Sequence, residues 1–194
     1  MSFSSEVKEE LSEQIASGRH WRLAETAAIL SLCGKIVITE NDRYCVKIQT
    51  ENLAVARKYF TLLRKTFNIR AEVSVRKSRE VRFYSVIVSK DPEARRLLGE
   101  TCLLDKDGNV SECMSPMHHR LLRQNCCRRA FIRGAFLAVG SVSDPEKSYH
   151  FEIVCTAPEK ARQLQELLAS YDVDAKVVLR KRHYVVYIKE GSQI

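Results

Sequence analysis

The sequence lacks any apolar run long enough to cross a membrane. Residues 1–18, where a targeting segment would stand, are rich in glutamate and serine and contain no unbroken apolar stretch. A membrane span needs about 20 consecutive apolar residues, and the core of a signal peptide needs roughly 7–15. We therefore expect neither a signal peptide nor a membrane span, and a cytoplasmic protein with no membrane partner.

The sequence also lacks the cysteine spacings of disulfide frameworks and zinc sites. Its seven cysteines are an odd number, and no Cys-x-x-Cys pair occurs. Cys33, Cys45 and Cys155 fall inside apolar or regular segments rather than in loops. This distribution favours reduced thiols.

A cluster of cysteines and histidines in the second half of the chain is the one candidate for metal binding. Its members are Cys113, His118, His119, Cys126 and Cys127. Thiolate and imidazole are the usual ligands of zinc, but adjacent residues of a helix point in different directions. We therefore expect ordinary helix residues at the paired cysteines, no metal site and no cofactor.

The composition indicates a folded, basic protein. Hydrophobic residues make up 45% of the 194 residues, enough for one globular domain or two fused small ones. The chain contains 32 lysines and arginines and 24 acidic residues, which gives a net charge of +8. Such an excess favours polyanionic partners, although composition alone does not separate DNA from RNA or from acidic proteins, and a basic surface that binds nothing is the alternative.

Self-comparison reveals an internal repeat. The matched pairs, at offsets of 106, 105 and 104 residues, are Gly34 and Gly140, Arg57 and Arg162, and Arg76 and Arg180. A constant offset indicates a duplicated supersecondary unit. The chain therefore divides into an N-terminal helical extension (1–18), a first half (19–100), a connecting segment (101–123) and a second half (124–194).

Each half is expected to contain the elements αββαββ. In the first half the patterns predict helices over 19–32 and 52–67, with strands over 35–39, 44–49, 69–76 and 81–88. Gly34 is expected to end the first helix with a positive φ, and Leu53, Ala56, Phe60 and Leu63 to form the buried stripe of the second. In the strand from Ile69, alternation predicts one covered and one exposed face.

The second half repeats this order. We expect helices over 124–139 and 158–170, a strand over 149–155 and a hairpin over 173–189. Thr156 and Glu159 have the spacing of a capping box. A further helix over 3–15 is expected to start at Ser4 or Ser5. The fold class is thus α+β, with antiparallel sheets in two related units.

The segment FIRGAFLAVGSVSD (131–144) resembles the LAGLIDADG motif of homing endonucleases, and TAAILSLCGKI (26–36) is a weaker copy. The resemblance implies two motif helices that cross at a pseudo-two-fold axis, beneath antiparallel sheets that form a saddle. Close crossing requires small side chains. The candidates for this helix interface are Ala24, Ala28, Gly34, Ala130, Gly134, Ala138 and Gly140.

The whole chain resembles the N-terminal part of the WhiA transcription regulators of Gram-positive bacteria. The opening FSSEVKEEL, the paired cysteines and GSVSDPEK carry this resemblance. It implies a role in sporulation, cell division and chromosome segregation, association with the nucleoid, and a C-terminal helix-turn-helix domain that these 194 residues do not contain. Two functions are open: a non-catalytic module with weak contact to the DNA backbone, or a scaffold that docks another transcription factor.

The resemblance also implies where a nuclease would hold its metal. LAGLIDADG nucleases use one carboxylate from the base of each motif helix, and the corresponding residues here are Cys33 and Val139. Neither side chain is a ligand for magnesium, which prefers oxygen. Asp42 and Asp144 lie downstream of the helix ends, but nothing in the sequence places them symmetrically. We expect no enzyme activity.

Cations near the hairpin tips are the candidates for contact with double-stranded DNA. They are Arg76, Lys77, Arg79, Arg82, Arg180, Lys181 and Arg182. Contact with phosphates would position the protein without reading sequence. Glu72, Glu152 and Asp174 on the same strands would repel phosphate, and the alternative is a solvated turn that protects the sheet.

A second basic cluster surrounds the start of the second motif helix. Its members are Arg120, Arg123, Arg128, Arg129 and Arg133. Such a cluster suits docking of a partner protein or of the DNA-binding domain. The alternative is a solvated helix face.

Overall fold

The chain folds into two αββαββ units, and the computed structural model describes residues 2–105, 107–110 and 120–194. The first unit contains α2 (Arg19–Cys33), β1 (Gly34–Ile38), β2 (Tyr44–Thr50), α3 (Leu53–Phe67), β3 (Glu72–Ser78) and β4 (Val81–Val88). The second contains α5 (Asn125–Val139), β5 (Gly140–Val142), β6 (Phe151–Cys155), α6 (Pro158–Ala169), β7 (Lys176–Arg180) and β8 (His183–Ile188). The expected duplicated α+β fold is confirmed.

Four further elements lie outside the repeat in the described part of the chain. An N-terminal helix, α1 (Phe3–Glu13), precedes the first unit, and α4 (Asp91–Glu100) follows it. Two short 3-10 turns cover Arg120–Leu122 and Gly191–Gln193. In the described part of the chain, no helix combines the length and the apolar character that crossing a membrane requires.

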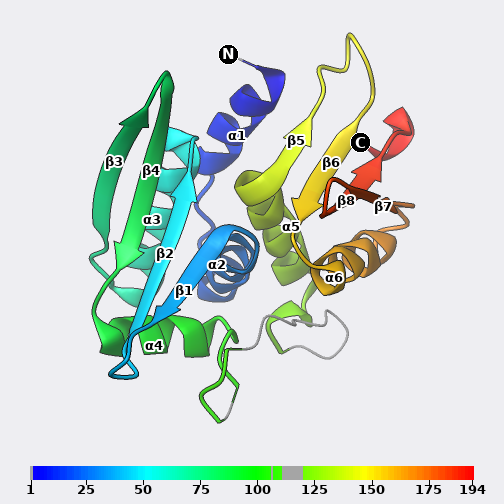
Figure 1. The fold of residues 1–194 in the computed structure, drawn as a ribbon. Coiled ribbons are helices and arrows are strands. Elements are labelled where there is room, and N and C mark those ends of the chain that lie inside the picture. Colours follow the sequence, from blue (N-terminus) through cyan, green and yellow to red (C-terminus); the bar gives the residue numbers. More distant parts are fainter. Residues whose placement is uncertain (1, 106, 111–119) are drawn as a thin grey trace.

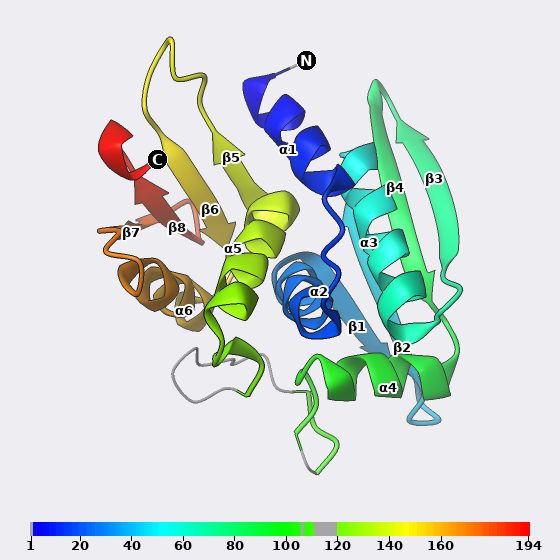
Figure 2. The same cartoon turned by 180° about the vertical axis from the view of Figure 1, so that it is seen from behind.

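The two sheets have the same antiparallel topology. Their strand orders are β1-β2-β4-β3 and β5-β6-β8-β7. The registers also correspond, because Gly34 pairs with Ile48 in one sheet and Gly140 pairs with Ile153 in the other. Figure 1 shows the strands of both sheets, and Figure 2 shows the helices that lie behind them.

Alternation along the strands divides each sheet into two faces. Val46, Ile48 and Val86 are at most 1% exposed and belong to the same hydrophobic core as Leu62 and Leu63 of α3. Their neighbours along each strand point the other way. We call the face opposite the helices the outer face, and in the described part of the chain no helix covers it.

Helices α2 and α5 pack against each other between the two sheets (Figures 1 and 2). A Cβ atom added to Gly134 would lie 2.5 Å from the carbonyl oxygen of Glu25 and 2.9 Å from the Cβ of Ala28. Ala24 and Ala130 are also buried in this region. The backbones therefore approach so closely that only glycine fits at position 134.

The expected positive φ at Gly34 is wrong. Its φ is −77° and its ψ is 151°, so it begins β1 in extended conformation. Glycine is needed there for space, since an added Cβ would lie 2.4 Å from the carbonyl oxygen of Leu30. At Gly140, with φ −86°, a Cβ would lie 2.5 Å from Cδ2 of Phe136. Both glycines allow a helix to turn directly into a strand.

In two elements the buried residues also differ from those expected. Leu53 is exposed and α3 instead buries Val55 and Tyr59, because this helix packs on α1 and α2 as well as on the sheet. Strand β3 is exposed along its whole length, with Val73 at 55% and Val75 at 59%. The reason is that α3 lies over β2 and β4 and leaves the edge strand uncovered.

Two of the expected helix caps do not form. Helix α1 is capped by Ser2, whose hydroxyl accepts from the N–H of Ser5 at 3.3 Å. Helix α6 begins after Ala157 with Pro158 in its first turn, and no side chain caps it, so the capping box from Thr156 does not form. A proline at the first position supplies the helical φ without needing a partner for an N–H group.

Candidate nucleic-acid interface

The two motif helices end side by side without carboxylates. Cys33 is the last residue of α2, and its thiol contacts the carbonyl oxygen of Ile29 at 3.2 Å. Burial raises the pKa of this thiol to about 12, although nearby Lys8 partly opposes the rise. Val139, the last residue of α5, has no ligand atom. At neutral pH, neither position offers an anionic ligand for a hard cation.

Asp42 and Asp144 do not substitute at this position. Asp42 lies in the β1–β2 turn with its side chain 81% exposed, 3.4 Å from Arg95. This turn is separated from the helix end by the five residues of β1, roughly 16 Å of strand. Asp144 accepts from the N–H of Glu146 at 3.0 Å and pairs with Lys147, and both contacts lower its pKa.

The strand registers place the expected hairpin cations on different faces. Arg76 pairs with Phe83, and Arg180 pairs with His183, so the two arginines occupy equivalent positions on the outer faces. Lys77 pairs with Arg82, and alternation puts both on the side that carries α3. The outer faces thus gather only part of the expected set.

The remaining three cations lie in the hairpin turns. Arg79 has a φ of 55°, Lys181 of 45° and Arg182 of 70°. Two successive residues with positive φ are typical of a type I′ turn. The two central positions of such a turn favour Asn and Gly. Left-handed backbone costs about 1–2 kcal/mol for a residue with a side chain. The β7–β8 turn therefore keeps two cations at an energetic cost.

Sequence reasoning missed a pair of lysines on the first outer face. Lys35 of β1 lies directly opposite Lys47 of β2. Like charges at directly opposed positions destabilise a sheet. Neither ammonium group forms an ion pair with any residue in the described part of the chain. The alternation of residues 44–50 could have indicated this position. Lys47 stands between the buried Val46 and Ile48, so its side chain points to the opposite face of the sheet.

At the equivalent place in the second sheet the charge is reversed. Ser141 pairs with Glu152, as Lys35 pairs with Lys47. The carboxylate of Glu152 lies 2.9 Å from Nε2 of His150, 3.7 Å from Arg180 and 3.3 Å from the hydroxyl of Ser141. Arg180 is therefore partly neutralised within the protein, and the two outer faces have different electrostatic characters.

Glu72 also lies on the first outer face, two strands away from Lys47. Its carboxylate accepts a hydrogen bond from the hydroxyl of Ser89. Asp174 precedes β7 and pairs with Lys176 at 2.7 Å. Each of these two carboxylates therefore has a donor within the protein.

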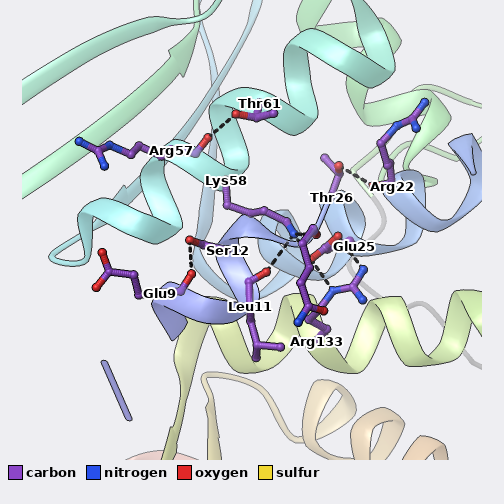
Figure 3. Close-up of polar contacts among 11 residues, drawn as sticks. Glu9, Leu11, Ser12, Arg22, Glu25, Thr26, Arg57, Lys58, Thr61 and Arg133 are labelled. Carbon is purple, nitrogen blue, oxygen red and sulfur yellow. Dashed lines mark hydrogen bonds and ion pairs between the residues drawn. The ribbon is translucent and has the colours of Figure 1, made fainter. Parts of the chain in front are cut away.

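The basic cluster around α5 is not a single surface. Arg133 is turned inward and forms hydrogen bonds of 2.8 and 3.0 Å with Glu25, while Lys58 lies 3.1 Å from the same carboxylate (Figure 3). Arg129 lies over the ring of Tyr171. For Arg133 the solvated face is wrong, because a buried acid on the neighbouring helix pairs with it.

The ionic network of Glu25, Lys58 and Arg133 is largely buried. The side chains of Glu25 and Lys58 are fully buried, and Lys58 also donates to the carbonyl oxygens of Leu11 and Gln14 in and after α1. Hydrogen bonding to Glu25 raises the pKa of Arg133. The network therefore ties the N-terminal helix to both crossing helices.

Of the metal candidates, Cys113, His118 and His119 lie outside the described residues. Cys126 and Cys127 lie in the first turn of α5, next to His20 of α2. Sequence reasoning did not consider His20, because it is more than 100 residues away along the chain.

Two family models match the chain. The model described as the WhiA N-terminal LAGLIDADG-like domain matches residues 19–104, and the model described as the WhiA LAGLIDADG-like domain matches residues 128–194. The two matches fall on the two αββαββ units.

Curated relatives match the chain over its whole length. A probable cell division protein WhiA from Lachnoclostridium phytofermentans is 48% identical over 196 residues, and one from Alkaliphilus oremlandii is 38% identical over 198 residues. The chain spans 63% and 62% of the lengths of these two relatives.

Solved structures share the fold. Full-length DUF199/WhiA from Thermatoga maritima has a TM-score of 0.75 at 19% identity, with 100% of this chain and 59% of that chain covered. The homing endonuclease I-DmoI in complex with DNA and Ca has a TM-score of 0.61 at 15% identity, with 90% of this chain and 86% of that chain covered.

Proposed function

The chain belongs to the WhiA family, and we propose that its two LAGLIDADG-like units form a non-catalytic, DNA-contacting module of a transcription regulator that acts in cell division. The contact would be made with the backbone of double-stranded DNA through the outer face of the first unit. Roles in sporulation and chromosome segregation, and a place at the nucleoid, belong to the same proposal.

The opposed lysines on the first outer face carry this proposal. Lys35 and Lys47 repel each other across the strands and lack a described counter-charge. A phosphate group placed between them would relieve the repulsion and release condensed counterions. Arg76 on the same face extends the positive surface toward the hairpin tip.

The geometry of the β7–β8 turn supports backbone contact. Lys181 and Arg182 hold left-handed conformations that glycine would adopt without cost. Retention of two cations at such positions is consistent with a function for their charge.

The helix ends support the absence of nuclease activity. Hydrolysis by a LAGLIDADG nuclease needs carboxylates that bring a divalent metal to the phosphates. Cys33 and Val139 stand at those two positions, and burial raises the pKa of the Cys33 thiol further above neutral pH, so this group is uncharged. We therefore expect DNA contact without cleavage.

A binding assay at two salt concentrations tests the proposal. Duplex DNA should bind the chain at low salt, and affinity should fall steeply as salt rises. Replacement of both Lys35 and Lys47 by Ala should lower the slope of log K against log salt by about 1, since the one phosphate held between them contributes about 0.9.

Lys77→Ala with Arg82→Ala is the matched control. It removes two exposed cations from the opposite side of the same sheet, so it changes net charge equally but leaves the outer face intact. Equal losses of affinity in the two double variants would refute the assignment of the outer face.

A protein-interaction scaffold is the second candidate. The edge strands β3 and β7 expose Val73, Val75 and Leu179 on the side that carries the helices, with Leu179 at 62%. Exposed apolar residues of this kind suit contact with another protein, such as a second transcription factor. Failure to bind DNA even at low salt would favour this function.

A further inference from the structure

The N-terminal ends of the two crossing helices bring three metal-binding residue types together. His20 is the second residue of α2, and Cys126 and Cys127 are the second and third residues of α5. One ligand atom from each residue lies within 4.8 Å of the other two. The histidine comes from the first unit and the cysteines from the second, so the cluster spans the two units.

The separation of the ligand atoms matches tetrahedral zinc. Nε2 of His20 lies 3.7 Å from Sγ of Cys126. With Zn–N and Zn–S bonds of about 2.0 and 2.3 Å at a tetrahedral angle, these two atoms would stand roughly 3.5 Å apart. The imidazole and the thiol therefore already occupy positions that one zinc ion would require.

The surroundings of the cluster leave one side open. Cys127 is 3% exposed and contacts the carbonyl oxygen of His20 at 3.8 Å, whereas Cys126 is half-buried and His20 is exposed. The side-chain oxygen of Gln124 lies 3.4 Å from the Cys126 thiol. This oxygen can complete four-coordination, which would close the site as structural zinc sites are closed.

We propose that His20, Cys126 and Cys127 form a zinc site that fastens the N-terminal ends of α2 and α5 to each other. Two thiolates balance the charge of the ion, and binding releases the two thiol protons to solvent. Burial and the neighbouring thiol raise the pKa of Cys127 to about 11, so zinc must displace a bound proton there.

The position of the site indicates a structural role. It stands at the end of the crossing helices opposite to Cys33 and Val139, where the nucleases would cleave DNA. The two adjacent cysteines can join the same site because their sulfur atoms lie within 4.8 Å of each other and of a ring nitrogen of His20. The proposal is independent of DNA binding.

Titration with Co²⁺ tests the site directly. Cobalt bound by thiolates in tetrahedral geometry is coloured, so the purified, reduced full chain should develop absorption that saturates at about one ion per chain. Zn²⁺ added in excess should then bleach this absorption, since zinc is the favoured ion for such ligands.

Substitution of the ligands should abolish binding. His20→Ala and Cys126→Ser should each weaken the affinity by more than about tenfold, because even changes around the ligands of known sites cost that much. His183→Ala and Cys45→Ser are matched controls on the outer faces, and they should bind cobalt as the parent chain does.

A second measurement needs no variant. Zn²⁺ should protect the half-buried Cys126 from alkylation in the parent chain, whereas Cys45 should react equally with and without the ion, as mapped by mass spectrometry. Absence of saturable cobalt binding, binding that survives in both ligand variants, or no protection of Cys126 would each overturn the proposal.

Discussion

The guanidinium of Arg133 donates two hydrogen bonds, of 2.8 and 3.0 Å, to the carboxylate of Glu25 across the helix crossing. This pair joins the second unit to the first at a point where Glu25 is fully buried. Lys58 approaches the same carboxylate from α3 at 3.1 Å. The crossing of small residues therefore contains a largely buried ionic network.

Removal of the acid from this network should destabilise the fold strongly. Glu25→Leu leaves Arg133 and Lys58 without their counter-charge, and breaking a buried pair in this way costs about 3–5 kcal/mol. Urea unfolding followed by circular dichroism measures the change. Glu10→Leu, an exposed position on α1, should shift stability by less than about 0.5 kcal/mol. Equal stabilities of the two variants would contradict the role of the network.

Enlargement of Gly134 should separate the crossing helices. In Gly134→Ala the new Cβ would meet the carbonyl oxygen of Glu25 at 2.5 Å, so we expect a loss of about 1–3 kcal/mol in unfolding free energy. Gly99→Ala in α4 is the matched control, since nothing lies within 4 Å of its added Cβ. That variant should be neutral or more stable, because alanine favours a helix by roughly 0.5–1 kcal/mol.

Neutralisation of Glu152 should strengthen DNA binding if the outer faces contact the backbone. Glu152→Gln removes a negative charge and frees Arg180, which now lies 3.7 Å from the carboxylate. The slope of log K against log salt should become steeper by about 1, as one further phosphate contact adds about 0.9. Asp172→Asn, exposed in the turn after α6, serves as a control for net charge alone. Weaker binding in Glu152→Gln would count against contact at the second face.

Stability should fall at alkaline pH because of Cys33. Burial raises the pKa of its thiol to about 12 in the folded chain from an ordinary value of 9.0. The folded state then holds a proton that the unfolded state releases, so this contribution is complete below about pH 9 and declines as the pH rises toward 12. Urea midpoints measured from pH 7 to pH 10 should fall less steeply in Cys33→Ala than in the parent chain. Parallel curves would show that this thiol does not govern the decline.

Much of the architecture could be predicted from residue patterns alone. The recurring offset identified the two units, and the periodicities predicted the order of their helices and strands. The small residues at Ala28 and Gly134 by themselves predict a helix crossing. These features are local or repeat along the chain, so sequence displays them directly.

The face on which a charge lies was much harder to predict. Lys77 and Arg82 seemed equivalent to Arg76 in sequence, but cross-strand register places them on the opposite side of the sheet. Strand pairing also brings Lys35 opposite Lys47 and gives Glu152 the equivalent place in the second sheet. Strand register depends on how α3 and the core pack against the strands, and it cannot be predicted from composition.

The sequence by itself determined the duplication, the class of fold and the loss of carboxylates at the ends of the motif helices, because each of these depends on residue identity at recurring positions. Only the tertiary structure decided that Arg133 turns inward to Glu25 and that His20 meets Cys126. Both contacts join residues more than 100 positions apart. Both contacts form because α2 and α5 approach each other closely, and this approach depends on how the core packs.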